Sequence, residues 1–417
     1  MLKLKNLLII GITILISSCG PNTIDYVDDK YAIDESGKLF LYEGNPYSGK
    51  VVRYFDTEKT LLNFEINYKD GLTHGLQVNY DEKGQLLFKT TYKDGLTHGL
   101  QVNYDEKGQL LFKTTYKDGK EDGLYESHFN NPEATLAIKT TYKDGKIDGL
   151  YDEYTQDGQL LIKTTYKDGE KDGPYIKYVK KFNFKVTDSN LIYIKTTYKN
   201  GKIDGLYEEF EDNRYREYGI IRKRNYKDGE LDGLEELYYE GKLEEKITYK
   251  DGKRNGLHEK YYSDGQLYVK ETYKDGKEDG LYEQYYENGE HFNINNDGKS
   301  NSIQNQLSNK INYKDGEYHG LYEKYHKNGQ LYVKETYKDG KEDGLYEKYY
   351  SDGQLLVRSA YKDGKLHGLF EEYYYNNGQL NIKATYKDGE RDGQYEVYHS
   401  NGHIAYKETY KDGVRVD

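Results

Sequence analysis

The stretch "YKDGKEDGLYEKYYSDGQL", residues 337–355, decides the fold because nearly the same residues return along most of the chain. A "YKDG" or "YKNG" tetrapeptide starts at Tyr68, Tyr92, Tyr116, Tyr142, Tyr166, Tyr198, Tyr226, Tyr249, Tyr273, Tyr313, Tyr337, Tyr361, Tyr386 and Tyr410. The commonest spacing is 24 residues, and residues 68–91 and 92–115 are identical. Such a period indicates a stacked repeat array. Below, position 1 is the tyrosine of each tetrapeptide, and positions are counted to 24.

Two turn signals divide each repeat. Positions 3 and 4 are Asp-Gly, as in Asp339-Gly340, and positions 16 and 17 are usually Asp-Gly or Asn-Gly, as in Asp352-Gly353. We expect both pairs to form two-residue turns with positive φ at both residues. The residues between them are rich in Tyr, Leu, Val, Ile and Thr and lack a helical period. The predicted fold is all-β: an extended array of about 14–15 antiparallel β-hairpin repeats over residues 39–417, forming a twisted or coiled single sheet.

Charges predict the register of these hairpins. A two-residue turn at positions 16 and 17 places position 11 opposite position 22. Position 11 is acidic in 10 of 13 repeats, and position 22 is basic in 13 of 14. Directly facing residues on neighbouring strands favour opposite charges. The register also places positions 10, 14, 19, 21 and 1 on one face, which is the expected core, as with Tyr346, Tyr350, Leu355, Val357 and Tyr361.

The composition limits the partners. The 417 residues include 51 Tyr, one Met and no Trp, and the formal net charge is −12. A core of this composition is thin and extended. A nucleic-acid partner is not expected, because such proteins gather Lys and Arg on one face without matching carboxylates.

The first residues resemble an export signal. Lys3 and Lys5 precede an apolar run, and "ISSC" matches a bacterial lipobox ending at Cys19. We therefore expect a signal peptide at residues 1–18, a lipid such as palmitate on Cys19, and a tether at residues 19–38. The alternative is an uncleaved anchor with an incidental thiol. Because Cys19 is the only cysteine, an internal disulfide and a cysteine-ligated metal are excluded.

The repeats differ in length only around the second turn. Insertions occur at residues 129–135, 179–190, 211–219 and 291–310. Insertions on one side of an array often mark its binding side, although neutral drift of exposed loops explains them equally well. The candidate partner-binding residues on these tips are Phe182, Phe184, Arg214, Tyr215, Arg216, Tyr218, Asn293 and Asn295.

No residue pattern indicates catalysis. His74, His98, His319 and His367 all occupy position 7, but other repeats have Asp or Asn there. These residue types share a tolerance of left-handed backbone, which favours a turn or bulge role. The segment from Asn293 to Gln304 has the rhythm of a calcium loop but lacks its first and last carboxylates. We expect no enzyme activity, no cofactor and no metal.

The blocks "GLYEKYYSDGQL" and "YKDGKEDG" resemble the bacterial variant of the MORN repeat, as found in the YwqK-like antitoxin family. The resemblance spans residues 41–417. It implies an all-β hairpin array and neutralisation of a toxin, and it supplies no catalytic residues. The lipoprotein signal departs from a cytoplasmic antitoxin.

Together these observations favour a lipid-anchored, non-enzymatic repeat scaffold that binds a protein partner at the bacterial cell envelope, facing the periplasm or the exterior. Two alternatives stay open. One is an immunity protein that neutralises an exported toxin. The other is a module that binds cell-wall glycan through its tyrosines.

Overall fold

The structure is a computed structural model that describes residues 22–27, 30–178, 192–211, 219–287 and 306–417. These residues form strands and turns and contain no helix. Accordingly, none of them belongs to a helix suited to crossing a membrane. The chain divides into two compact units, residues 1–191 and 192–417, which we call the N-terminal and the C-terminal unit. The expected all-β hairpin array is confirmed in both.

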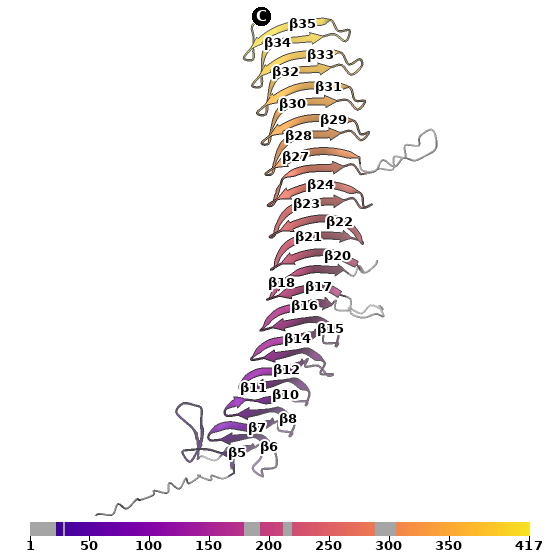
Figure 1. Ribbon diagram of the computed structural model, residues 1–417. Coiled ribbons are helices and arrows are strands. Elements are labelled where there is room, and N and C mark those ends of the chain that lie inside the picture. Colours follow the sequence, from indigo (N-terminus) through magenta and orange to yellow (C-terminus); the bar gives the residue numbers. More distant parts are fainter. Residues whose placement is uncertain (1–21, 28–29, 179–191, 212–218, 288–305) are drawn as a thin grey trace, which may run out of the picture. The chain divides into compact units, whose positions relative to one another are not determined.

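The N-terminal unit is a meander in which β5 to β16 pair antiparallel in chain order, with β9 and β10 sharing one strand position (Figure 1). Strand β1 pairs with β5 in parallel, and β2 to β4 form a separate three-stranded sheet. The strands are β1 (Thr23–Asp25), β2 (Tyr31–Ile33), β3 (Phe40–Tyr42), β4 (Asn45–Pro46), β5 (Gly49–Tyr54), β6 (Leu62–Lys69), β7 (Leu72–Tyr80), β8 (Leu86–Lys93), β9 (Leu96–Thr97), β10 (Gly99–Tyr104), β11 (Leu110–Lys117), β12 (Lys120–His128), β13 (Leu136–Lys143), β14 (Lys146–Tyr154), β15 (Leu160–Lys167) and β16 (Glu170–Tyr178).

The C-terminal unit continues the same pattern with antiparallel neighbours throughout. Its strands are β17 (Ile192–Lys199), β18 (Lys202–Ile203), β19 (Gly205–Glu211), β20 (Gly219–Lys227), β21 (Glu230–Tyr239), β22 (Lys242–Lys250), β23 (Lys253–Tyr261), β24 (Leu267–Lys274), β25 (Lys277–Glu278), β26 (Gly280–Tyr285), β27 (Leu307–Lys314), β28 (Glu317–Tyr325), β29 (Leu331–Lys338), β30 (Lys341–Tyr349), β31 (Leu355–Lys362), β32 (Lys365–Tyr373), β33 (Leu380–Lys387), β34 (Glu390–Tyr398), β35 (Ile404–Lys411) and β36 (Val414–Arg415).

The first turn has the expected geometry. Asp339 and Gly340 have φ values of 49° and 76°, and Lys338 pairs with Lys341 across them. Positive φ at both residues is the mark of the two-residue turn that matches strand twist. The Gly340 amide also donates a 2.9 Å hydrogen bond to the Tyr318 carbonyl of the preceding repeat. This edge of the sheet is therefore tied from one repeat to the next.

The second turn differs from the expectation. In the repeat from Tyr337, only Gly353 has positive φ, at 91°, and Tyr349 pairs with Leu355. Inside that pair the Tyr350 amide donates a 2.8 Å hydrogen bond to the Gln354 carbonyl, which leaves a loop of three residues, 351–353, rather than two. The register shifts after Lys348. A type I turn followed by a left-handed glycine produces this geometry.

One repeat does form a two-residue second turn. Glu240 and Gly241 have φ values of 49° and 74°, with Tyr239 paired to Lys242. This repeat, from Tyr226 to Thr248, has 23 residues instead of 24. The register still shifts between Leu237 and Tyr238, so the missing residue shortens the turn and leaves the bulge in place.

The register between the turns is confirmed. Glu347 at position 11 faces Arg358 at position 22. It also faces Lys334 of the preceding repeat, a pairing that the turn arithmetic did not address. Each acidic residue at position 11 thus lies between two basic residues on neighbouring strands, and a charge ladder crosses the sheet of each unit.

The most buried position is not one of the five expected for the core. Tyr346, Tyr350, Leu355, Val357 and Tyr361 are only half-buried. Position 23, on the same face as position 10, is nearly inaccessible in many repeats. The residues there with at most 3% exposure include Thr90, Thr114, Thr140, Thr164, Thr196, Ser359 and Ala384. In one layer of strands, a small side chain between large neighbours is covered by them, while the tyrosines keep their outer surfaces.

An aromatic cap closes the N-terminal unit. Ile24, Phe40, Tyr47 and Val51 form its buried core, with Phe40 stacked on Tyr68 at 4.6 Å between ring centroids. Strands β1 and β2 belong to this cap, and the tether expected at residues 19–38 therefore overlaps folded structure.

Candidate binding surfaces

The residues singled out from the sequence lie outside the part of the chain that the structure describes. These are Cys19 and the tip residues Phe182, Phe184, Arg214, Tyr215, Arg216, Tyr218, Asn293 and Asn295. Their roles stay predictions. The insertion at 129–135 is described, and its loop packs on its neighbours: Gln109 Nε2 donates to the Pro132 carbonyl at 2.7 Å.

Position 7 caps the first turn of the following repeat. The Asp168 amide donates a 3.1 Å hydrogen bond to Oδ2 of Asp148 one repeat earlier. His74 acts in the same way, with Nδ1 lying 3.4 Å from the Asp94 amide nitrogen. The aspartate and histidine side chains at position 7 therefore each provide an acceptor atom for the turn of the next repeat.

The left-handed backbone expected at position 7 lies one residue later. Gly75 and Gly149 at position 8 have φ values of 93° and 111°, whereas His74 and Asp148 are not among the residues with positive φ. The expected bulge is present, but the residue with left-handed backbone is the glycine at position 8 and not the residue at position 7. Ser48, ahead of the first tetrapeptide, also accepts from the next turn, the Asp70 amide, at 2.8 Å. In the sequence, the one sign of this role is that Ser48 directly precedes Gly49.

A row of exposed leucines occupies position 9. In the N-terminal unit its exposed members are Leu100, Leu124 and Leu150. In the C-terminal unit they are Leu206, Leu234, Leu257, Leu345 and Leu369. Their exposed fractions lie between 36% and 56%. The sequence analysis missed this row, although the recurrence of leucine directly before the Tyr of the core face signals it.

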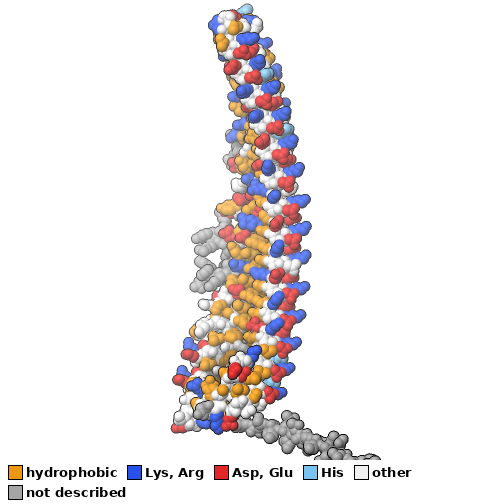
Figure 2. Space-filling model, turned by 90° about the vertical axis from the view of Figure 1, so that its left-hand side faces the viewer, with side chains coloured by type: hydrophobic (Ala, Val, Ile, Leu, Met, Phe, Trp, Pro, Cys, Tyr) orange, Lys and Arg blue, Asp and Glu red, His pale blue; other side chains and the backbone are white. Residues whose placement is uncertain are grey.

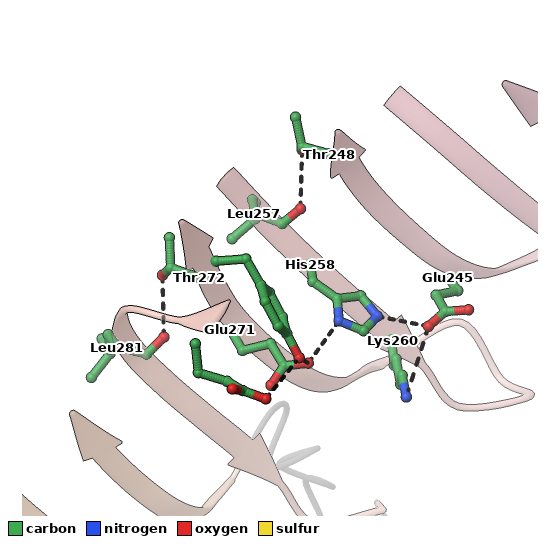
Figure 3. Close-up of polar contacts among 10 residues, drawn as sticks. Glu245, Thr248, Leu257, His258, Lys260, Glu271, Thr272 and Leu281 are labelled. Atoms are coloured by element: carbon green, nitrogen blue, oxygen red, sulfur yellow. Dashed lines mark hydrogen bonds and ion pairs between the residues drawn. The ribbon is translucent and has the colours of Figure 1, made fainter. Parts of the chain in front are cut away.

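Position 24 lies between successive leucines and keeps its polar atoms turned to the backbone. Thr248 Oγ1 donates to the Leu257 carbonyl at 3.0 Å, and Thr272 Oγ1 donates to the Leu281 carbonyl at 3.3 Å (Figure 3). At these two places the row alternates between a leucine and a threonine whose hydroxyl is already bonded.

The charge ladder lies beside the leucine row on the same face, because positions 9 and 11 are two residues apart on one strand. Its basic side chains extend outward and its acidic ones are recessed. Arg358 has 47% of its side chain exposed against 10% for Glu347, and Lys407 has 43% against 13% for Glu396. Figure 2 shows one side of the molecule, where basic and acidic side chains alternate beside hydrophobic ones. We call positions 9, 11, 22 and 24 together the leucine–lysine face.

The opposite face carries the tyrosines. Tyr346 and Tyr361 meet edge to face at 5.9 Å between centroids, as do equivalent pairs in other repeats. Burial raises the pKa of Tyr346 to about 12, with a smaller contribution from the charge of Glu335. The tyrosine rings are half-buried and pack against one another along a row. Little of each ring's flat surface is therefore free to stack on a sugar.

One repeat replaces this tyrosine with a histidine. His258 has a side-chain exposure of 1% and lies between two carboxylates, with Nε2 2.6 Å from Oε1 of Glu245 and Nδ1 2.6 Å from Oε1 of Glu271 (Figure 3). Burial opposes ionisation of Glu271, but the hydrogen bond and charge of His258 outweigh it and lower the pKa of that carboxyl. Each ring nitrogen of His258 therefore faces a carboxylate oxygen.

These carboxylates contact the histidine directly. Among the described residues, no group of three or more His, Cys, Asp or Glu side chains is arranged to bind a metal ion. Glu245 also lies 3.7 Å from Lys260 Nζ, and Glu271 accepts from the Tyr273 hydroxyl at 3.2 Å. The cluster is an internal ion network within the tyrosine face.

The family model described as "MORN repeat variant" matches nine segments of this chain. They are residues 73–94, 97–118, 147–168, 231–251, 254–275, 318–339, 342–363, 366–388 and 391–412. The chain is a MORN-repeat protein. Each matched MORN segment begins at position 6, just after one first turn, and ends on the aspartate of position 3 that begins the next one. It therefore contains the second turn, position 9 and the ladder positions 11 and 22.

Other comparisons add little to the MORN assignment. No curated protein matches this sequence. Among solved structures, "Crystal Structure of TcdB2-TccC3-TEV" aligns at 10% identity and a TM-score of 0.17, covering 89% of this chain and 21% of that one. "Crystal Structure of TcdB2-TccC3 without hypervariable C-terminal region" aligns at 12% identity and a TM-score of 0.16, covering 92% and 20%. This chain thus spans about a fifth of those chains, and scores this low carry no argument about it.

Proposed function

We propose that this MORN-repeat protein is a non-enzymatic scaffold that binds a protein partner through its leucine–lysine face. The observation that carries the proposal is the leucine row, which keeps five side chains at least 36% exposed at one repeat position of the C-terminal unit. An apolar row is costly to leave in water at about 25 cal/mol per Å², and a contiguous one marks an interaction site. The adjacent basic side chains favour a partner with acidic groups.

Repetition supports a binding role over catalysis. The same side chains recur in successive repeats, so a long partner makes many similar contacts and the individual weak affinities combine. Catalysis needs a unique constellation of groups, and the titratable cluster around His258 is enclosed within the sheet.

We also propose that the protein is anchored to the cell envelope by a lipid on Cys19, on the basis of the lipobox-like "ISSC". Metabolic labelling with a palmitate analogue tests this. The unchanged chain is expected to be labelled and to partition into detergent, and Cys19→Ser is expected to lose both properties. Equal partitioning of the two chains contradicts the anchor.

Affinity capture from gently solubilised native cells tests partner binding. The variant combines Leu234→Ser, Leu257→Ser and Leu345→Ser, and the control is Tyr375→Ser, which removes an aromatic side chain 57% exposed outside the row. We expect one stoichiometric protein with the unchanged chain and the control, and its loss with the triple variant. Equal recovery by all three contradicts the proposal.

The identity of the captured protein decides between the related hypotheses. A toxin encoded beside this gene favours the immunity role that the family resemblance implies. Sedimentation with purified cell wall, without any captured protein, favours a glycan module. The tyrosine face would then be the surface to mutate.

A further inference from the structure

The leucine row of the C-terminal unit has a regular spacing that limits what binds to it. Seven consecutive repeats place leucine at position 9, on β19, β21, β23, β26, β28, β30 and β32. Successive leucines are separated by one intervening strand, because each of these strands pairs with the next through a single neighbour. Strands lie about 4.8 Å apart, and the leucines therefore recur about every 9.6 Å across the sheet.

Regular polypeptide conformations match this spacing to different degrees. A polyproline II helix has three residues per turn and a rise of about 3.1 Å, so every third side chain returns to the same side after about 9.3 Å. An α-helix needs two turns, about 10.5 Å for seven residues, and falls out of step by about 5 Å over six intervals. In a β-strand every third side chain points to the opposite face.

The charge ladder indicates which charged residues a polypeptide segment bound along the leucine row would carry. The basic side chain at position 22 extends beyond the recessed carboxylate at position 11, as with Arg358 and Glu347. This arrangement repeats along the row with the same spacing as the leucines, because both positions occur once in each repeat. An acidic residue once per turn of the bound segment would meet a basic side chain at each repeat.

Small side chains at position 24 leave room between the leucines. Thr248 and Thr272 use their hydroxyls on backbone carbonyls, and Asn225 Nδ2 donates to the Leu234 carbonyl at 2.8 Å. The single hydroxyl protons of Thr248 and Thr272 are therefore both bonded, as is one of the two amide protons of Asn225. An apolar side chain of the partner can enter the gaps beside the two threonines without burying an unpaired donor.

We infer that the leucine–lysine face of the C-terminal unit binds an extended, acidic polypeptide segment in the polyproline II conformation, lying across the strands with an apolar residue at every third position. The inference rests on the proposed function and names the chemistry of the partner. Each turn of the segment places one apolar side chain between two leucines and one carboxylate beside the basic side chain of position 22.

A synthetic peptide tests the inference directly. The probe is fluorescein-labelled (Pro-Glu-Leu)7, in which the residue before each proline is biased towards the extended conformation. The control peptide has the same composition, with its leucines spaced alternately two and four residues apart. Fluorescence anisotropy with the full-length mature protein at low and at 0.5 M salt measures both affinities.

We expect the period-three peptide to bind at least tenfold more tightly than the control peptide. Its affinity should fall at least tenfold in 0.5 M salt and at least tenfold with the triple variant Leu234→Ser, Leu257→Ser and Leu345→Ser. Equal affinities for the two peptides, or binding unaffected by the triple variant, overturn the inference. Circular dichroism confirms that the variant keeps its strands.

The two proposals fail in distinguishable ways. If the peptide does not bind but the triple variant loses a captured envelope protein, the extended-segment inference is wrong and the proposed function stands. If the triple variant neither loses a captured protein nor weakens the peptide, both are wrong.

Discussion

The carboxylate of Asp148 accepts a 3.1 Å hydrogen bond from the amide of Asp168, which begins the turn of the following repeat. This contact joins repeats that are already paired as strands, and it recurs with aspartate, histidine or serine as the acceptor. It explains why the first turn hardly varies while the second accepts insertions. A first turn that changed length would lose its bonds to the preceding repeat.

Removal of the acceptor at position 7 should loosen the next turn. Asp148→Ala is expected to lower the local opening free energy around Asp168 by about 1 kcal/mol, the usual cost of losing a capping acceptor. Asp148→Asn retains an acceptor oxygen and should lose less than half as much. Amide hydrogen exchange measures both, and equal exchange rates in the two variants would show that the carboxylate does not cap the turn.

The charge ladder should contribute modestly. Glu396 lies 2.8 Å from Lys407 Nζ, and that hydrogen bond is the main cause of its lowered pKa. A double-mutant cycle with alanine at both positions should give a coupling free energy of about 0.2–1 kcal/mol that shrinks in 1 M salt. Hydrogen exchange in β34 and β35 measures it. A coupling that is zero at low salt contradicts a stabilising role.

The histidine cluster should be sensitive to the removal of one partner. His258→Ala leaves the Glu271 carboxylate, 12% exposed, without its imidazole partner and should lower the local stability of β23 and β24 by about 3 kcal/mol. The double variant His258→Tyr/Glu271→Thr recreates the Tyr-Thr pair found at Tyr151 and Thr164. It should recover most of the loss. If the double variant is as unstable as the single one, the ion network is not the cause.

Alkaline pH should destabilise the tyrosine face. Burial is the first cause that raises the pKa values of Tyr282, Tyr285 and Tyr325 to about 12, whereas tyrosines in an unfolded chain ionise near pH 10. Between these values the unfolded chain has lost protons that the folded chain keeps. Stability is therefore complete below pH 10 and falls as the pH rises towards 12. Urea midpoints at pH 9 and 11 measure this, and equal midpoints contradict it.

The sequence predicted most of the fold because turn and charge signals recur with one period. Asp339-Gly340 predicted its turn correctly, and the charges of Glu347 and Arg358 predicted their pairing. The second turn was mispredicted because an Asp-Gly pair also ends a three-residue loop, and only the loop length separates the two. The burial of Thr164 was missed because it depends on the tyrosines beside it and not on its own polarity.

The candidate surface was less predictable. Leu257 looks like a core residue by its chemistry, but it lies on the opposite face of the sheet from its neighbour His258 and is 37% exposed. The tip residues drew attention because their sequences are irregular. The leucines were overlooked because they are regular.

Site-specific photo-crosslinking in native cells tests most directly whether the leucine–lysine face holds the partner. A photoreactive amino acid replaces Leu257 on this face in one chain and Lys348, two residues after Tyr346 on the opposite face, in another. We predict a crosslinked protein from the Leu257 site and none from the Lys348 site. A partner captured from the Lys348 site alone would contradict binding through the leucine–lysine face.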